Sequence, residues 1–206
     1  MTIGILILIA YLLGSIPTAV WYGKTLYKID VREHGSGNAG ATNTLRVLGN
    51  KAGFIVLYID MLKGFIATSL VYFTHYVKSD SQFFKVQMAL GVVAVIGHVF
   101  PLFANFRGGK GIATIMGMAI SLDYRIALIC TLLFILIVWG TKYISVGSMF
   151  GAVAGAMLSF YFYGTDQPIV NGFFIALSMM VIYTHRANIK RLMVGNENKF
   201  AFKKSN

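Results

Sequence analysis

The segment 32–46, REHGSGNAGATNTLR, has the residue types of an anion-binding loop. Gly35, Gly37 and Gly40 allow consecutive backbone N–H groups to turn toward one point, which is how a loop cradles a phosphate. Arg46 adds a planar guanidinium group that suits phosphate. Neutral side-chain donors come from Ser36, Asn38, Thr42 and Asn43. An ordinary polar loop also carries turn residues, but this density of donors favours anion binding.

A second segment, 97–111 (GHVFPLFANFRGGKG), ends in a basic, glycine-rich turn. The turn precedes an apolar run and consists of Arg107, Gly108, Gly109 and Lys110. We therefore expect it at a helix N-terminus, where exposed N–H groups attract anions. The turn is not a Walker A loop, because that pattern requires glycine at position 104 and serine or threonine at position 111. A plain basic turn beside a membrane would account for Arg107 but not for the glycines around Lys110.

The third segment, 185–197 (HRANIKRLMVGNE), has the composition of a basic helix at a membrane surface. That interpretation leaves His185, Asn188 and Glu197 unexplained, so we consider them candidates for a binding or catalytic site. Ser145 and Ser148 begin another apolar run, and they are candidates to add hydroxyl groups to the same site.

Two opposite charges, Asp60 and Lys63, stand three residues apart inside an apolar run. This spacing places them on one helical face, where they either pair with each other or serve a function. The sequence lacks the residue patterns of metal binding, disulfide formation and serine nucleophilic catalysis. The four histidines have no metal-ligand spacing, Cys130 is the only cysteine, and no Gly-x-Ser-x-Gly motif supplies a serine nucleophile. We therefore expect no metal, no cofactor and no intramolecular disulfide.

The elements that position these residues are expected to be membrane helices. The chain has 206 residues, of which 57% are hydrophobic and only 12% charged, too few charges to cover a soluble protein of this size. The net charge of +11 would suggest nucleic acid in a soluble protein. Because the basic residues lie between apolar runs, they indicate membrane orientation and anionic ligands instead. With three prolines and no low-complexity tract, we expect a single domain, 1–206.

An all-α fold with about seven membrane-spanning helices is predicted from the length of the apolar runs. The first is interpreted as a retained helix rather than a cleaved signal, and Pro17 is expected to kink it. The fourth and fifth are short, and they are either two helices meeting at 122–125 or a re-entrant turn followed by one span. The predicted spans are 2–23, 53–77, 83–104, 112–123, 126–141, 144–163 and 168–184.

The distribution of basic residues predicts the orientation. With the N-terminus outside and the C-terminus in the cytoplasm, fourteen lysines and arginines fall on the inner side and three on the outer side, while Lys63 lies within a span. This asymmetry is the one that the positive-inside rule expects. All three segments described above therefore face the cytoplasm in this arrangement.

These segments carry a resemblance to a known family. The chain resembles the bacterial acyl-phosphate:glycerol-3-phosphate acyltransferases (the PlsY family) along essentially its whole length. The matching motifs are Gly14-Ser-Ile-Pro17, Gly35-Ser-Gly-Asn-x-Gly-Ala-Thr-Asn43 with Arg46, Asp60-x-x-Lys-Gly64, Gly97-His98-x-Phe-Pro101, Phe106-x-Gly-Gly-Lys-Gly111, and His185-Arg-x-Asn188 with Gly195 and Glu197. Each motif is weak alone, but their order and spacing are specific.

The resemblance implies transfer of a fatty acyl group from acyl phosphate to the 1-hydroxyl of glycerol 3-phosphate, at the cytoplasmic face of the cell membrane. The products would be lysophosphatidic acid and inorganic phosphate. The resemblance also implies catalytic roles for Ser36, Lys110, His185 and Asn188. Substrate-binding roles fall to Gly37, Asn38, Thr42, Asn43, Arg46, His98, Arg107, Gly108, Gly109, Ser145, Ser148 and Glu197, with the choice between the two serines open.

An activated acyl donor needs no covalent enzyme intermediate, so we expect direct attack of the hydroxyl on the acyl carbon. The base is either His185 or a phosphate oxygen of the donor, and the resemblance favours the second. Membrane lipids are expected as further partners, nucleic acid is not, and a monomer is expected to suffice. The alternative functions are a transporter of small phosphate esters and a non-catalytic lipid-binding subunit; the absence of internal repeats disfavours the first.

Overall fold

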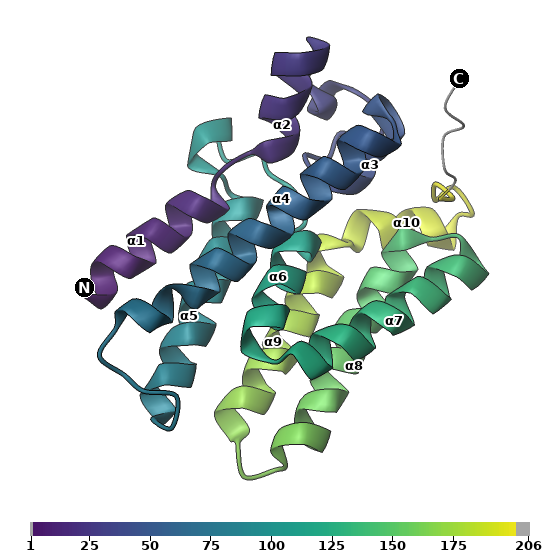
Figure 1. Cartoon of the computed structure of the whole chain (residues 1–206). Coiled ribbons are helices and arrows are strands. Elements are labelled where there is room, and N and C mark those ends of the chain that lie inside the picture. The colour runs from purple at the N-terminus through teal and green to yellow at the C-terminus, as the bar shows by residue number, and fades with distance from the viewer. Residues whose placement is uncertain (1, 201–206) are drawn as a thin grey trace. The chain divides into compact units, whose positions relative to one another are not determined.

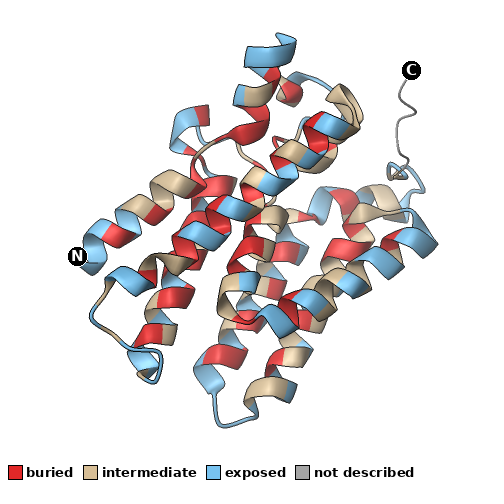
Figure 2. Cartoon of the chain, in the orientation of Figure 1, coloured by how far each residue is buried: buried red, intermediate tan, exposed pale blue. Residues whose placement is uncertain are grey.

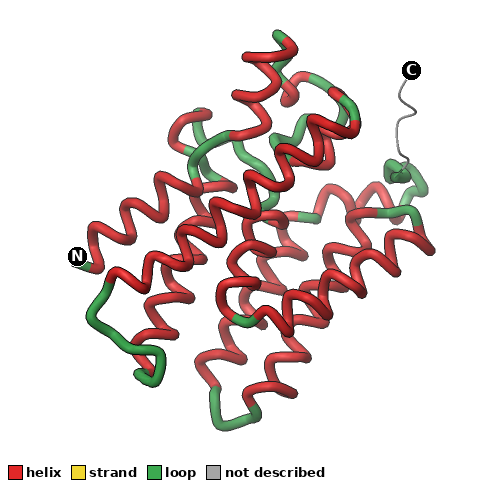
Figure 3. The backbone as a smooth tube through the Cα atoms, viewed as in Figure 1, coloured by secondary structure: helices red, strands yellow, loops and turns green. Residues whose placement is uncertain are grey.

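The computed structural model describes residues 2–200, and within that range every regular element is a helix. Contacts divide the chain into two compact units, 2–122 and 123–200. Figure 3 shows helices joined by loops in both units. The prediction of an all-helical chain is therefore confirmed for these residues, whereas the single domain stays a prediction.

The first unit contains α1 (Ile3–Gly14), α2 (Thr18–Tyr22), α3 (Ala41–Leu48), α4 (Asn50–Ser69), α5 (Ser81–Val99) and α6 (Ile112–Leu122). A single π-helical turn extends α2 from Gly23 to Tyr27, and short 3₁₀ turns cover Val31–Glu33, Leu70–Phe73 and Leu102–Ala104. α1, α4 and α5 pack around a buried apolar cluster, and α6 packs on α4 (Figure 1).

Glycines allow the helices of the first unit to pack closely. A Cβ atom on Gly64 of α4 would overlap the carbonyl of Thr114 on α6, and one on Gly117 of α6 would overlap that of Met61 on α4. Gly14 of α1 lies equally close to Ala94 of α5. Small residues at helix contacts are typical of membrane proteins, where close van der Waals packing replaces the hydrophobic drive.

The second unit contains α7 (Tyr124–Thr141), α8 (Ile144–Tyr163), α9 (Pro168–Thr184) and α10 (Arg186–Met193). α8 packs against both α7 and α9. The Tyr163 hydroxyl donates to Asp123 Oδ2 at 2.9 Å, which joins the end of α8 to the start of α7. Large apolar side chains such as Trp139 of α7 are exposed, as expected of a surface that meets lipid. Figure 2 shows that exposed residues recur along the helices as well as in the loops.

Within residues 2–200, four helical segments are long and apolar enough to cross a membrane: Asn50–Phe73, Ser81–Ala104, Tyr124–Thr141 and Ile144–Tyr163. Two bent pairs raise the number to six, because α1 with Thr18–Tyr27 bends by 41° and α9 with α10 bends by 56°. The first bend confirms the kink expected near Pro17. α6 has 11 residues, about 16 Å of helix against a hydrocarbon core of about 30 Å. Seven spans therefore stay a prediction.

Candidate active site

The glycine-rich loop of the first unit is shaped from within by Asn43. Its Oδ1 accepts a hydrogen bond from the Ser36 N–H at 2.8 Å, and its Nδ2 donates to the carbonyls of Val31 at 2.7 Å and His34 at 3.0 Å. The side chain is buried. Asn43 thus commits Oδ1 and both Nδ2 hydrogens to holding the loop, so its task in this structure is structural and no side-chain hydrogen is left for the predicted donor role.

The loop presents its other predicted donors differently. Gly35 and Gly37 have φ values of 61° and 70°, in the left-handed region that favours glycine. Between them Ser36 is exposed. Thr42 and Arg46 lie one turn apart on α3, so they share a helical face. Asn38, Thr42 and Arg46 are half-buried. The segment 32–46 therefore combines an exposed serine with a helix that carries the arginine.

The second predicted segment makes a tight turn between α5 and α6. The N–H groups of Gly108 and Gly109 donate to the carbonyls of Val99 and His98, each at 3.2 Å. A Cβ on Gly108 would overlap the His98 carbonyl, and one on Gly109 would overlap the His98 ring. The two glycines are thus required for close approach to the end of α5. Lys110 follows them, half-buried and two residues before α6 begins.

His98, expected to bind substrate, is a buried residue that faces the Asp60–Lys63 pair. Asp60 Oδ1 lies 2.8 Å from Lys63 Nζ and accepts the Thr18 hydroxyl at 2.9 Å. His98 Nδ1 lies 3.7 Å from the same oxygen, and Lys63 Nζ also donates to the Ile16 carbonyl at 2.9 Å. The pairing of Asp60 with Lys63 is confirmed, and it ties the break after α1 to α4.

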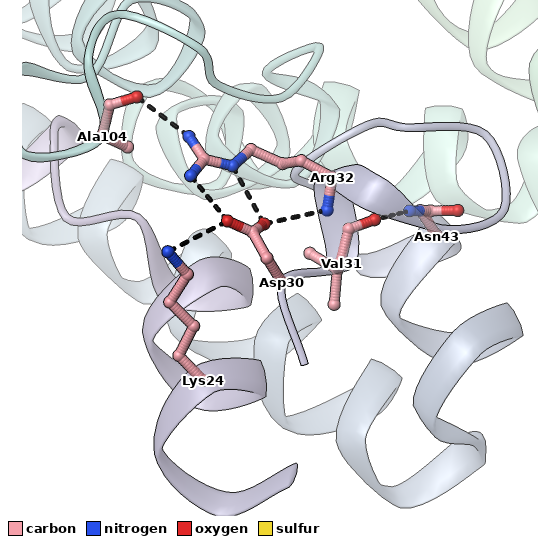
Figure 4. A network of polar contacts seen from close by, with 6 residues as sticks. All are labelled: Lys24, Asp30, Val31, Arg32, Asn43 and Ala104. Carbon is pink, nitrogen blue, oxygen red and sulfur yellow. Dashed lines mark hydrogen bonds and ion pairs between the residues drawn. The ribbon is translucent and has the colours of Figure 1, made fainter. Parts of the chain in front are cut away.

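The first two predicted segments lie side by side in the first unit. Arg32 Nη1 donates to the Ala104 carbonyl at 3.0 Å, and Asp30 accepts from the same guanidinium group (Figure 4). Hydrogen bonds from Arg32 hold the pKa of Asp30 far below its ordinary value, although burial opposes the shift. Sequence reasoning assigned neither residue a role of its own, although Arg32 begins the segment 32–46, because only the folded chain shows that Arg32 reaches the Ala104 carbonyl. Arg107 is exposed in the same turn.

The third predicted segment belongs to the second unit and converges on Glu197. Glu197 Oε1 accepts from the Ser145 hydroxyl at 2.8 Å and from Asn188 Nδ2 at 2.6 Å. Oε2 accepts from Arg191 Nε at 2.8 Å. Burial raises the pKa of Glu197, but the hydrogen bonds outweigh it, so the pKa lies below its ordinary value. Sequence reasoning missed Arg191, which reads as one more basic residue of a membrane-surface helix.

Hydrogen bonds distinguish Ser145 from Ser148, and a further one fixes the ring of His185. Ser148 donates to the Ile144 carbonyl of its own helix at 3.0 Å, whereas Ser145 joins the Glu197 cluster. His185 is buried at the bend between α9 and α10, with Nδ1 2.8 Å from the Val181 carbonyl. A carbonyl only accepts, so Nδ1 carries the hydrogen and the basic nitrogen of the neutral ring is Nε2.

Comparisons with known proteins agree with one another along nearly the whole chain. The family model described as glycerol-3-phosphate acyltransferase matches residues 4–195. A glycerol-3-phosphate acyltransferase of Enterococcus faecalis is 42% identical over 98% of this chain and 94% of its own. One of Listeria monocytogenes is 44% identical over 97% and 98%.

Two solved structures share the fold. The crystal structure of PlsY (YgiH), an integral membrane glycerol 3-phosphate acyltransferase, matches in its glycerol 3-phosphate form with a TM-score of 0.84 at 35% identity, over 97% of this chain and 96% of that one. The lysophosphatidic acid form matches with a TM-score of 0.82 at 36% identity, over 97% and 95%.

Proposed function

The chain belongs to the glycerol-3-phosphate acyltransferase family, and from this premise we propose how its residues carry out the reaction. It is an integral, multi-pass membrane enzyme that acylates glycerol 3-phosphate to lysophosphatidic acid. The acyl donor is acyl phosphate. The choice of acyl phosphate as the donor rests on one observation. The loop around Ser36 and the turn before Lys110 are joined in one unit, and both have the chemistry of phosphate sites.

Both substrates carry phosphate, so the site needs cationic groups and N–H donors. Arg46 binds the phosphate of glycerol 3-phosphate through its guanidinium fork, and Asn38 and Thr42 add neutral donors. Lys110, with Arg107, neutralises the phosphate of the acyl donor, while the N–H groups of Gly108 and Gly109 hold the turn against the end of α5. Two separate phosphate-binding elements are what a reaction between two phosphate-bearing substrates requires.

The transfer is a single displacement. The 1-hydroxyl oxygen of glycerol 3-phosphate attacks the acyl carbon, and the bond from that carbon to the phosphate oxygen breaks. The hydroxyl proton passes to an oxygen of the donor's own phosphate, which leaves as inorganic phosphate. Ser36 and Lys110 stabilise the negative charge that develops during attack. No enzyme nucleophile is required, because acyl phosphate is already activated.

In this proposal Glu197 holds in place the side chains that donate hydrogen bonds to it, which are those of Ser145, Asn188 and Arg191. Glu197 stays ionised at neutral pH, as its lowered pKa indicates, and it fixes the amide of Asn188 and the hydroxyl of Ser145. His185 orders the same region through Val181. We place all these residues at the cytoplasmic face, as the excess of basic residues supports.

Purified protein in lipid tests the proposal. Given acyl phosphate and glycerol 3-phosphate together, it is expected to release inorganic phosphate and form lysophosphatidic acid in equal amounts. Either substrate alone is expected to give neither product beyond the uncatalysed rate. Acylation from an acyl thioester, but not from acyl phosphate, would contradict the assignment of the donor.

A further inference from the structure

The chain contains the same local motif twice, Asp-x-Arg, with the same geometry. In each copy the aspartate Oδ1 accepts from the backbone N–H and the Nε of the arginine two residues later, both at 3.0 Å, and Oδ2 accepts from Nη2 at 2.7 Å. Asp30 thereby caps the Val31–Glu33 turn, and Asp123 caps α7. The motif by itself is therefore a helix-capping device.

The two copies differ in what surrounds them. The Arg125 side chain is 48% exposed and lies over the Phe162 ring. The Arg32 side chain is only 13% exposed, and its Nη1 donates to the Ala104 carbonyl at 3.0 Å, 72 residues away (Figure 4). Capping does not require that contact. The hydrogen bond between Arg32 and the Ala104 carbonyl links the start of the glycine-rich loop to the turn that carries Lys110.

The Ala104 carbonyl belongs to a strained turn. The next two residues, Asn105 and Phe106, have φ values of 54° and 56°, and this left-handed conformation is costly for a bulky aromatic residue. The same carbonyl also accepts the Arg107 N–H at 3.2 Å. Arg32 thus stabilises the turn at Ala104, the residue after which the chain reverses direction toward Arg107 and Lys110.

The contact continues into the other loop. Val31, between Asp30 and Arg32, accepts through its carbonyl from Asn43 Nδ2, and Asn43 Oδ1 accepts from the Ser36 N–H. The connection therefore runs from the Ala104 carbonyl to Arg32 by a hydrogen bond, to Val31 along the backbone, and through Asn43 to Ser36 by two further hydrogen bonds. We propose that Asp30 and Arg32 form a positioning clamp that sets the Ser36 loop and the Lys110 turn at the spacing required for acyl transfer.

This proposal rests on the proposed function, because it assumes that groups of both loops act in one transition state. A displacement of about 1 Å between such groups costs about 100-fold in rate. Lysine keeps the charge at position 32 but lacks the fork needed to bond Asp30 and Ala104 at once. Arg32→Lys is therefore expected to lower kcat by about 100-fold, with both KM values changed by less than about fivefold.

The matched control is Arg125→Lys, the same change in the same local motif. Lys24→Gln is a second control, because Lys24 pairs with Asp30 from an exposed position. Both are expected to keep kcat within about fivefold of the wild type, since exposed ion pairs contribute little. An inactive wild type would refute the proposed function, whereas an active wild type with an equally active Arg32→Lys variant would refute only the clamp.

Chemical rescue separates positioning from folding. Arg32→Ala is expected to lose activity and to regain part of its kcat on addition of millimolar guanidinium, which fills the same polar site. Failure of guanidinium to restore a folded Arg32→Ala variant would overturn the proposal. If Arg32→Ala does not fold, Asp30→Asn takes its place: a loss of kcat with unchanged thermal stability supports the clamp, and wild-type kcat contradicts it.

Discussion

Arg46 lies one helical turn beyond Thr42, at the end of the polar stretch that begins with Ser36. Arg46→Lys keeps the charge but loses the bidentate fork. We expect the apparent KM for glycerol 3-phosphate to rise about tenfold, since a hydrogen bond to a charged group contributes about 1.5–3 kcal/mol. The KM for acyl phosphate serves as the internal control, and an equal rise in both would show that Arg46 does not distinguish the substrates.

His185 is expected to order the bend between α9 and α10 rather than to act as the general base. His185→Gln should therefore keep kcat within about tenfold of the wild type, because removing a true base costs about 100-fold or more. The pH profile of kcat is the more specific measurement. If the acid limb disappears together with most of the activity, the base is His185 and not the donor phosphate.

Residue types in the sequence indicate a phosphate-binding chemistry, but they do not indicate the structural task of each residue. The donors around Ser36 and Lys110 could be identified because glycine, amide and basic residues rarely gather beside apolar runs. Asn43 holds its own loop, and Arg32 reaches a carbonyl 72 residues away. Such tasks depend on which backbone groups the fold brings near, and a single sequence does not contain that information.

The turn from α5 to α6 depends on the missing side chain of Gly109, whose Cβ would overlap the His98 ring. Gly109→Ala is therefore expected to displace Lys110 and lower kcat by about 100-fold. Gly172→Ala is the matched control, because nothing lies within 4 Å of its added Cβ on α9. The control should keep full activity and gain about 0.5–1 kcal/mol of helix stability; equal activity of the two variants would contradict the packing argument.

Long apolar runs predicted the long helices well. The predicted span 144–163 coincides with α8, and 83–104 lies within the segment Ser81–Ala104. Helix length follows from a hydrophobic run with polar ends, which is visible in sequence. The short helix α3 was not predicted as a separate element, because it lies inside a polar segment and depends on neighbouring structure. α10 corresponds to the basic helix that the composition of 185–197 indicated.

For the whole molecule, the proposed topology can be measured with single cysteines. Cys130 is the only native cysteine, so Cys130→Ala gives a background for labelling from outside the cell. Ser79→Cys, Tyr124→Cys and Asp166→Cys are expected to react with a membrane-impermeant reagent. Lys142→Cys and Asn196→Cys should react only after the membrane is opened. If 112–123 does not cross the bilayer and 126–141 does, position 124 is protected and the positions that follow exchange sides, so that 142 and 196 react from outside and 166 does not.

The central claim is that Lys110 and the Ser36 loop act together on two phosphate-bearing substrates. The most direct test is phosphate release by Lys110→Ala in lipid, with acyl phosphate and glycerol 3-phosphate both supplied and thermal unfolding measured in parallel. The expected result is a folded protein with no release above the uncatalysed rate. Near-normal release from a folded Lys110→Ala variant would contradict the claim.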